Sequence, residues 1–565
     1  MTALDTVPFV DEESAEAPAV APRVRVRGLD VGFRTRTGIR SVVRGVSFDL
    51  APGRCLAIVG ESGSGKSVTA RSLVGLTGPT AQVVAEAIEI DGVDVRDLDP
   101  RRWRALRGRR IGFILQDALV SLDPLRPVGR EIDEALRLHG AGDRRSRRRR
   151  VLELLRAVGV PQPERRARQR PGELSGGLRQ RALIASAIAL DPPLVIADEP
   201  TTALDVSVQA QVLAQLADMK SRGVSIVLIS HDLSVVAHLA DEVLVMRGGE
   251  VVEQGDARTV LADPRHPYTR SLIAAVPGGH TRSTRLAPDV ELPHIDATAL
   301  RGAARVVHDG PVLEVAHLSK RFRTPGGGSH LAVDDVSFTL DKGRTLGIVG
   351  ESGSGKSTTA RLALALERAD AGEVSLLGQP WSALPESRRR ALRRRISVVS
   401  QDPLSSFDPR FDVRQLLDDA LDGTPFRTTA AREARIRELL AQVALPDEVL
   451  RRLPSQLSGG QRQRVAIARA LAASPDVIVL DEAVSALDVS VQAQILDLLV
   501  ALQDALGISY LFISHDLGVI HHLSDHILVM KDGVVVEEGD PDQVFHRPTH
   551  PYTRQLVDAL LTLEN

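Results

Sequence analysis

The chain has 565 residues, too many for one ordinary hydrophobic core, and its 43% apolar content favours several globular units. A formal net charge of −2 provides no overall electrostatic attraction to nucleic acids. The single cysteine, Cys55, excludes an internal disulfide and a cysteine-ligated iron–sulfur cluster, and we expect this residue to pack inside a strand.

The N-terminal residues, MTALDTVPFVDEESAEAP, lack the basic and then apolar pattern of a signal peptide, and we expect residues 1–21 to form a disordered tail. No segment approaches the roughly 18 consecutive apolar residues of a membrane-spanning helix. We therefore expect a soluble, cytoplasmic protein that acts at a membrane only through partners.

Residues 60–67 read GESGSGKS and follow a short apolar run, as expected where a parallel strand feeds a helix. This octapeptide fits the phosphate-binding P-loop pattern, and it returns unchanged at 350–357. Its glycines let backbone N–H groups approach a phosphate, and the helix that follows adds its positive end. We predict that Lys66 and Lys356 reach the β- and γ-phosphates. Nucleotide contacts are predicted from both loops and the residue after each: Gly60, Glu61, Ser62, Gly63, Ser64, Gly65, Lys66, Ser67 and Val68, and Gly350, Glu351, Ser352, Gly353, Ser354, Gly355, Lys356, Ser357 and Thr358.

Each loop is followed by the same order of segments, including an Arg- and Leu-rich stretch of helical spacing at 118–172 and again at 403–455. Further peptide pairs carry the repeat: GFILQD and SVVSQD, SGGLRQR and SGGQRQR, ALDVSVQAQ twice, ISHDL twice, and HPYTR twice. We therefore predict a first domain at 22–276, a linker rich in Gly, Pro, Thr and Ala at 277–310, and a second domain at 311–565.

Each half also contains an apolar strand that ends in Asp-Glu, LVIADE at 194–199 and VIVLDE at 477–482. Ligands bind at the carboxyl ends of strands in open α/β sheets. We predict that the aspartates organise a Mg²⁺ ion and that Glu199 and Glu482 polarise the attacking water. The predicted metal ligands are Ser67, Gln116 and Asp198 in the first half, and Ser357, Gln401 and Asp481 in the second.

Two other polar residues recur at equivalent places. His231 and His515 each follow an apolar strand, and we predict that they contact the γ-phosphate. Gln116 and Gln401 stand where a strand meets the helical segment, so they can reach the metal or water on one side and a mobile subdomain on the other. The predicted catalytic residues are Gln116, Glu199 and His231, and Gln401, Glu482 and His515.

LSGG at 174–177 and 457–460 precedes a helix and predicts a second anion-binding helix start in each half. Each half already has a P-loop for its own phosphate. A second phosphate-binding helix start is therefore useful only if it binds the nucleotide of the other half. Together with the P-loops, ALDVSVQAQ and HPYTR, the chain resembles the ATP-binding subunits of ATP-binding cassette (ABC) transporters, fused in tandem. The HPYTR segments make it most similar to the dipeptide and oligopeptide importer group. The resemblance covers nearly everything outside the tail and linker.

The resemblance implies an α/β fold of two P-loop NTPase domains, each with a RecA-like parallel core, an antiparallel β arm and a helical subdomain. It also implies ATP and Mg²⁺ bound in two composite sites, in which the Lys66 loop faces the second LSGG and the Lys356 loop faces the first. Leu178 departs from the pattern where the second copy has Gln461. The residues implied by the family, besides those above, are Phe33 and Phe322 against adenine, Ser175, Gly176, Gly177, Ser458, Gly459, Gly460 and Gln461 on phosphate, and Asp205 and Asp488 across the interface.

The function implied is ATP hydrolysis that drives an importer, at the cytoplasmic face of the membrane. The expected partners are two permease subunits and a separate substrate-binding protein. Short peptides lead as the solute, with nickel, opines and glutathione-like compounds as alternatives. Other classes are a tandem cassette acting on ribosomes or DNA, and an exporter. The run Arg144–Arg150 is interpreted as a solvated helix face, with lipid headgroup contact as the alternative.

Overall fold

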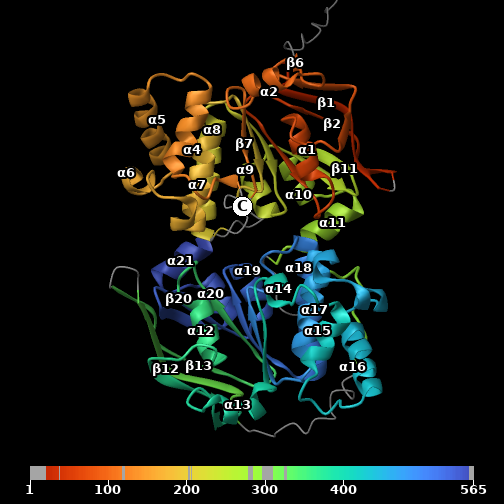
Figure 1. The fold of residues 1–565 in the computed structure, drawn as a ribbon, viewed down its shortest axis with the longest axis vertical. Helices are drawn as coiled ribbons and strands as arrows, with labels where there is room; N and C mark the ends of the chain where they lie inside the picture. The colour runs from red at the N-terminus through yellow and green to blue at the C-terminus, as the bar shows by residue number, and fades with distance from the viewer. Residues whose placement is uncertain are drawn as a thin grey trace, which may run out of the picture.

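The structure is a computed structural model that describes residues 21–36, 38–116, 121–201, 204, 206–277, 284–295, 310–323 and 328–558, with the backbone alone at 206 and 207. The predicted tail, apart from residue 21, and Asp205 therefore lie outside the described residues. Each half contains one mostly parallel sheet and one antiparallel sheet, and the main elements follow the same order in both (Figure 1).

The central sheet of the first half has the strand order β11-β10-β3-β9-β8-β7. Neighbouring strands are parallel except for the pair of β10 with β11. β3, β8 and β9 are apolar and buried along their whole length, as expected for strands covered on both faces. These strands are β3 (Cys55–Val59), β7 (Ile111–Ile114), β8 (Leu194–Asp198), β9 (Ser225–Ile229), β10 (Glu242–Arg247) and β11 (Glu250–Asp256).

The first antiparallel sheet is built on β1, which pairs with β2, β4 and β5. Alternating residues of β1 and β2 are buried, which fits a sheet with one face on the core. Its strands are β1 (Val24–Thr35), β2 (Gly38–Leu50), β4 (Ala81–Val84), β5 (Ala87–Ile90) and β6 (Val93–Asp94).

The Arg- and Leu-rich segment of the first half is helical, as predicted, and α4 and α5 pack on each other and on α7. The helices of this half are α1 (Lys66–Leu73), α2 (Pro100–Leu106), α4 (Val128–Leu138), α5 (Arg144–Ala157), α6 (Pro163–Arg166), α7 (Gly176–Ala187), α8 (Val206–Ser221), α9 (Leu233–Leu239), α10 (Ala257–Ala262) and α11 (Pro267–Ala274).

The second half repeats this plan, with a central sheet of order β17-β18-β19-β14-β20-β21 and an antiparallel sheet of order β13-β12-β15-β16. Its strands are β12 (Leu313–Arg323), β13 (Ser329–Leu340), β14 (Thr345–Val349), β15 (Ala371–Leu376), β16 (Gln379–Pro380), β17 (Ile396–Val399), β18 (Val477–Asp481), β19 (Ser509–Ser514), β20 (His526–Lys531) and β21 (Val534–Gly539). Its helices are α12 (Lys356–Ala363), α13 (Glu386–Arg393), α14 (Pro403–Ser406), α15 (Val413–Ala420), α16 (Thr429–Gln442), α17 (Gly459–Leu471), α18 (Val489–Leu506), α19 (Leu517–Leu523), α20 (Pro541–His546) and α21 (Pro551–Asp558). The predicted fold class is confirmed.

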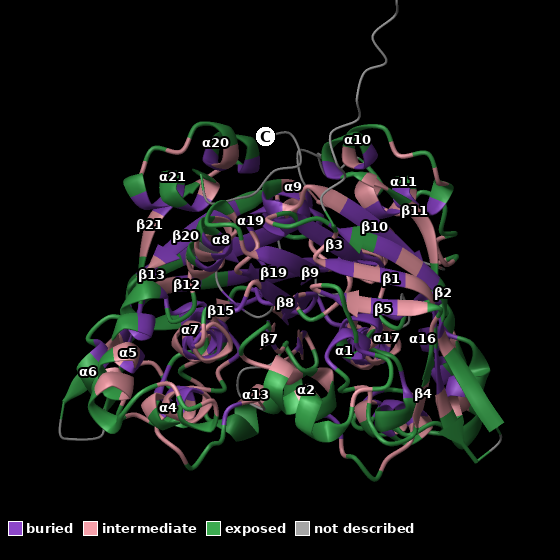
Figure 2. Cartoon of the chain, turned by 90° about the horizontal axis from the view of Figure 1, so that it is seen from above, coloured by how far each residue is buried: buried purple, intermediate pink, exposed green. Residues whose placement is uncertain are grey.

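The two halves are stacked head to tail. Figure 1 shows α4, α5 and α7 of the first half on the same side of the molecule as α12, β12 and β13 of the second. Figure 2, turned by 90°, keeps α7 near β12 and β15 and places α17 on the side of α1. Each helical subdomain therefore lies on the same side of the molecule as the P-loop helix of the other half (Figure 1, Figure 2).

Side chains of the second half also hold a described part of the predicted linker. The backbone N–H groups of Leu286 and Ala287 donate to the two carboxylate oxygens of Asp497 on α18, at 3.0 and 2.9 Å. Leu286 is 1% exposed and belongs to the core of the second half. In the first half Ala214 stands in place of Asp497, so the equivalent helix there has no carboxylate at this position.

Among the described helices, α18 is the one that is long and apolar enough to cross a membrane by length and composition alone. Half of it is buried inside the protein, where Ala493, Leu496 and Leu499 belong to the core of the second half. This helix therefore packs as a core element here.

The arginine run forms the first half of α5. Arg147 pairs with Asp133 at 2.9 Å and Arg150 pairs with Asp191 at 2.7 Å, both within the first half. This pairing supports the interpretation as a solvated helix face.

Candidate nucleotide-binding sites

Both P-loops adopt a backbone that only glycine fits. Gly65 and Gly355 precede α1 and α12 in the left-handed region, each with a φ of 103°. A Cβ on Gly60 would lie 2.1 Å from the Met246 carbonyl oxygen, and one on Gly350 would lie 2.2 Å from that of Met530. The other P-loop residues before each lysine lie between the strand and the helix in each half, and Val68 and Thr358 fall in the first turn of α1 and α12.

The P-loop lysines are buried and are held by their own loops. The Lys66 ammonium donates to the carbonyl oxygens of Gly60 and Glu61, at 2.6 and 2.8 Å, and Lys356 makes the same contacts with Gly350 and Glu351. Burial lowers the pKa of Lys66, because the charged ammonium loses water. A bound phosphate would stabilise the charged form of such a lysine, because it supplies the negative charge that the loop carbonyls do not.

Two of the three predicted Mg²⁺ ligands, the serine and the aspartate, contact each other in both halves, whereas the glutamine contacts the catalytic glutamate. The Ser67 hydroxyl donates to Asp198 Oδ1 at 2.8 Å, and Ser357 donates to Asp481 at 3.0 Å. Asp198 has no exposed surface, and its Oδ2 has no hydrogen-bond partner among the described residues, although the Arg71 guanidinium lies 3.9 Å away. Burial raises the pKa of both aspartates. A hydroxyl beside a buried carboxylate with an unused oxygen fits a hard divalent cation such as Mg²⁺.

The predicted catalytic groups of each half also meet on one carboxylate. Gln116 Nε2 donates to Glu199 Oε2 at 2.7 Å, and His231 Nδ1 lies 3.4 Å from Glu199 Oε1. In the second half Gln401 donates to Glu482 at 2.6 Å, and His515 Nδ1 lies 3.6 Å from Glu482 Oε1.

The histidine and glutamate shift each other's protonation. Burial lowers the pKa of His231 and of His515, but the hydrogen bond and charge of the neighbouring glutamate outweigh it, and both pKa values are raised. The neighbouring His515 imidazole lowers the pKa of Glu482. This carboxylate is thus kept ionised, which is the form that can accept a proton from water.

Both glutamates also carry backbone strain. Glu199 has a φ of 50° and Glu482 a φ of 49°, in the left-handed region that non-glycine residues rarely adopt. The backbone N–H of each donates to a carbonyl of the next strand, Ile229 and Ile513, at 2.9 Å. Strain of this kind is maintained at functional sites, where it fixes the direction of a side chain.

Comparison with known proteins identifies this pattern. Residues 43–202 and 333–485 match the family described as ABC transporter. Residues 252–295 and 536–565 match the oligopeptide/dipeptide transporter C-terminal region. The chain belongs to the ABC transporter ATP-binding proteins. It carries two ABC ATPase domains, which bind ATP and couple its hydrolysis to transport.

The chain covers most of the length of several curated relatives. The oligopeptide transport ATP-binding protein OppD of Mycobacterium tuberculosis is 42% identical over 96% of this chain and 98% of its own. The peptidoglycan transport ATP-binding protein YejF of Agrobacterium fabrum is 44% identical over 96% and 97%. The glutathione import ATP-binding protein GsiA of Pectobacterium atrosepticum is 42% identical over 95% and 89%.

The two ABC signature segments differ in how they start their helices. Ser458 caps α17, because its hydroxyl accepts from the Gln461 N–H at 3.2 Å while the Gln461 side chain accepts from the Ser458 N–H at 3.1 Å. Ser175 stands at the same place before α7 but has no side-chain cap, and Leu178 has no acceptor to return. The departure at Leu178 therefore leaves the first signature without the capping box of the second.

The second glycine of each LSGG segment packs against the next helix in the chain, which is α8 for Gly177 and α18 for Gly460. A Cβ on Gly177 would lie 2.7 Å from Val208, and one on Gly460 would lie 2.6 Å from Val491. Gly176 and Gly459 begin α7 and α17. These glycines bring the start of the signature helix against the starts of α8 and α18.

One residue of the second half acts on the nucleotide site of the first. The negative charge of Asp488 opposes the lowering of the Lys66 pKa and favours the raised pKa of His231. Asp488 directly precedes α18. Its counterpart Asp205 lies outside the described residues, so the reciprocal contact is not described.

The predicted adenine residues lie on the antiparallel sheets. Phe33 is half-buried near the end of β1, and Phe322 is 39% exposed near the end of β12. The Lys320 ammonium lies 5.4 Å from the centre of the Phe322 ring. Their contact with a base stays a prediction.

Sequence reasoning missed the part that the HPYTR tyrosines play. The Tyr268 hydroxyl accepts from the backbone N–H of Glu61 in the first P-loop at 3.0 Å, and Tyr552 accepts from Glu351 at the same distance. The preceding histidine ring caps the helix, since His266 Nδ1 accepts from the Tyr268 N–H at 3.1 Å. Exact repetition of HPYTR after each P-loop was the signal that could have suggested this contact.

Proposed function

We propose that this chain is the energy-coupling ATPase of an importer for short peptides. The observation that carries the proposal is the pair of P-loops, each joined by a tyrosine hydrogen bond to a C-terminal region of the oligopeptide/dipeptide transporter type. The names of the relatives, which refer to oligopeptide, peptidoglycan and glutathione transport, support peptide-like solutes.

We infer that each ATP binds between the halves. The Lys66 loop would work with Ser458 and Gly460, and the Lys356 loop with Ser175 and Gly177. The head-to-tail placement of α7 and α17 supports this pairing (Figure 1), as does the charge of Asp488 on Lys66. Two helix starts would then hold one triphosphate from opposite sides, so ATP stabilises the closed molecule.

The hydrolytic step follows from the contacts at Glu199 and Glu482. Ser67 and Asp198, and Ser357 and Asp481, would hold Mg²⁺, which supplies charge neutralisation on the β- and γ-phosphates. The ionised glutamate orients a water for in-line attack and accepts its proton. His231 and His515, whose pKa values are raised by the neighbouring glutamates, would place an imidazole N–H donor beside the γ-phosphate.

Coupling to transport would start at Gln116 and Gln401. Each glutamine contacts the catalytic glutamate and lies at the end of an edge strand, before the helical subdomain. A permease helix seated beside that subdomain would sense whether the glutamine is held at the site. We therefore infer two permease subunits, a separate substrate-binding protein, and a position at the cytoplasmic face of the membrane.

Substitution of the glutamates tests the proposal. Glu199→Gln with Glu482→Gln keeps the shape of both sites and removes the proton acceptor, so ATP hydrolysis should fall about 100-fold or more while ATP binding remains. Each single variant reports its own site, and an unchanged rate in Glu199→Gln would show that the first site does not hydrolyse ATP.

Transport is tested by co-purification. The chain should isolate with two membrane permeases, and proteoliposomes of that complex should accumulate a labelled peptide supplied with the substrate-binding protein and ATP. Accumulation of glutathione but not of peptides would reassign the solute. Sedimentation with ribosomes in place of permeases would refute the importer.

A further inference from the structure

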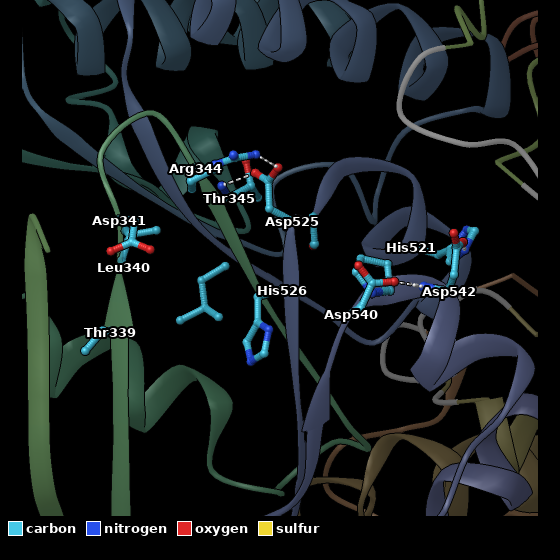
Figure 3. A pocket seen from close by; sticks show the side chains of 13 residues that line it. Thr339, Leu340, Asp341, Arg344, Thr345, His521, Asp525, His526, Asp540 and Asp542 are labelled. Carbon is cyan, nitrogen blue, oxygen red and sulfur yellow. Dashed lines mark hydrogen bonds and ion pairs between the residues drawn. The ribbon is translucent and has the colours of Figure 1, made fainter.

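A cluster of metal-ligating side chains lies outside the nucleotide sites, where α19 meets α20. His521 comes from α19, and Asp542 and His546 come from α20. One ligand atom of each residue lies within 4.8 Å of the others, and His521 Nε2 is 2.8 Å from Asp542 Oδ1 (Figure 3). His521 is buried, whereas Asp542 and His546 are exposed.

Local structure aligns these groups. Asp540 caps α20 by accepting from the Asp542 N–H at 3.0 Å, which fixes the first turn. Asp542 and His546 are four residues apart on this helix, so their side chains share one face. α20 packs on α19, and this contact brings His521 to the same face.

The duplicated fold provides an internal comparison. The segment LGVIHHLSD at 517–525 corresponds to LSVVAHLAD at 233–241, and GDPDQVFHRP at 539–548 corresponds to GDARTVLADP at 255–264. The positions of His521, Asp542 and His546 are therefore occupied in the first half by Ala237, Arg258 and Ala262, listed in the same order. α9 and α10 pack on each other there as α19 and α20 do. The fold does not need the three ligating residues, yet the second half carries all of them.

The cluster adjoins an open acidic groove. Figure 3 shows His521 and Asp542 at one end of this groove, with Asp540 beside them. Asp341 and Asp525 also line it, and Arg344 is paired with Asp525 at 2.9 Å. Excess negative charge and an opening to solvent give a cation a path to the ligands.

We propose that His521, Asp542 and His546 bind one divalent transition-metal ion, with Zn²⁺ as the ion that fits best. Two imidazoles and one carboxylate are a donor set that Zn²⁺ takes in proteins, and a fourth position would remain open to water from the groove. Bound metal would tie α20, and through it the Tyr552 segment, to the core of the second half.

The present contact between His521 and Asp542 is also explained by packing alone. The His521 ring lies 4.5 Å from the Phe545 ring, so the hydrogen bond also fits a purely structural role in packing α20 on α19. Zinc binding distinguishes the two explanations, because packing alone predicts none. His546 is exposed and lies outside that hydrogen bond, and its ring packs edge-on against those of His521 and Phe545, at 5.8 and 5.1 Å. A test should therefore remove His546 first and leave the buried His521 in place.

The test is Zn²⁺ titration of the metal-stripped full chain by calorimetry, without nucleotide. We expect one equivalent to bind tightly, and His546→Ala and Asp542→Asn to lose this binding. His526→Ala is the matched control, because His526 lines the same groove but lies outside the cluster, and its binding should equal that of the unchanged chain. Unaltered binding by His546→Ala, or no stoichiometric binding by the unchanged chain, would overturn the site.

Thermal unfolding gives a second readout. Because an ion that binds only the folded chain stabilises it, Zn²⁺ should raise the midpoint of the unchanged chain and of His526→Ala, and leave that of His546→Ala where it was. Equal shifts in all three would assign the effect to other residues. Neither measurement depends on ATP hydrolysis or on transport.

Discussion

The hydrogen bonds from Tyr268 and Tyr552 to the P-loops make a residue-scale prediction. Tyr268→Phe and Tyr552→Phe each remove one hydroxyl and leave the ring packed, so a loop N–H loses its acceptor. We expect ATP affinity at that site to fall about fivefold, which corresponds to roughly 1 kcal/mol for one hydrogen bond. Titration with a fluorescent ATP analogue measures this change.

Tyr510 is the matched control for this prediction. It is the only other tyrosine of the chain, and its hydroxyl donates to the Leu499 carbonyl at 3.0 Å inside the core. Tyr510→Phe should lower the free energy of unfolding and leave ATP affinity unchanged. If all three variants behave alike, the HPYTR tyrosines contribute to packing alone.

Cys55 makes a second prediction at this scale. Burial raises the pKa of its thiol to about 12, so almost no reactive thiolate forms below that pH in the folded chain. At pH 8 a thiol reagent should therefore label Cys55 only when β3 opens, and ATP should slow the labelling because β3 leads into the first P-loop. Mass spectrometry follows the reaction, with the urea-unfolded chain as the fully labelled control. Rapid labelling of the native chain would contradict this placement.

At the scale of single elements, Leu178 explains how the two signature helices differ. Leu178→Gln should complete the capping box of α7 and stabilise its first turn by about 0.5–1 kcal/mol. Hydrogen exchange of the first amides of α7, measured without nucleotide, should slow accordingly. The reverse change, Gln461→Leu, should speed exchange at α17. Changes of the same sign in both helices would show that the capping box is not the cause.

Elements were also the scale at which the sequence was most informative. The P-loops, the buried strands that end in Asp-Glu and the helical segments were predictable, because glycine patterns, apolar runs and helical spacing are local signals. The contact of Tyr268 with Glu61 was not, since the residues are far apart in the chain and neither carries a local mark of the other. The cluster at His521 was not predictable either, because its residues come from two helices that meet only in the fold.

For the whole molecule, Asp497 makes the remaining prediction. Its buried carboxylate, 4% exposed, holds the N–H groups of Leu286 and Ala287. Asp497→Ala leaves both donors without an acceptor, and hydrogen bonds to a charged group contribute about 1.5–3 kcal/mol each. We expect residues 284–295 to become sensitive to limited proteolysis, while Ala214→Ser on the equivalent helix of the first half should have no such effect. Equal resistance of both variants would refute the attachment.

This attachment also determines how the molecule responds to dilution. Two separate cassettes would have to associate before ATP could close them, so their ATPase rate per chain would fall as the protein is diluted. Here the two halves belong to one chain, and the segment between them is attached to α18 of the second half through Asp497. This connection keeps each half at a high local concentration near the other. Closure is then a unimolecular event whose rate the cell cannot change through the abundance of the protein.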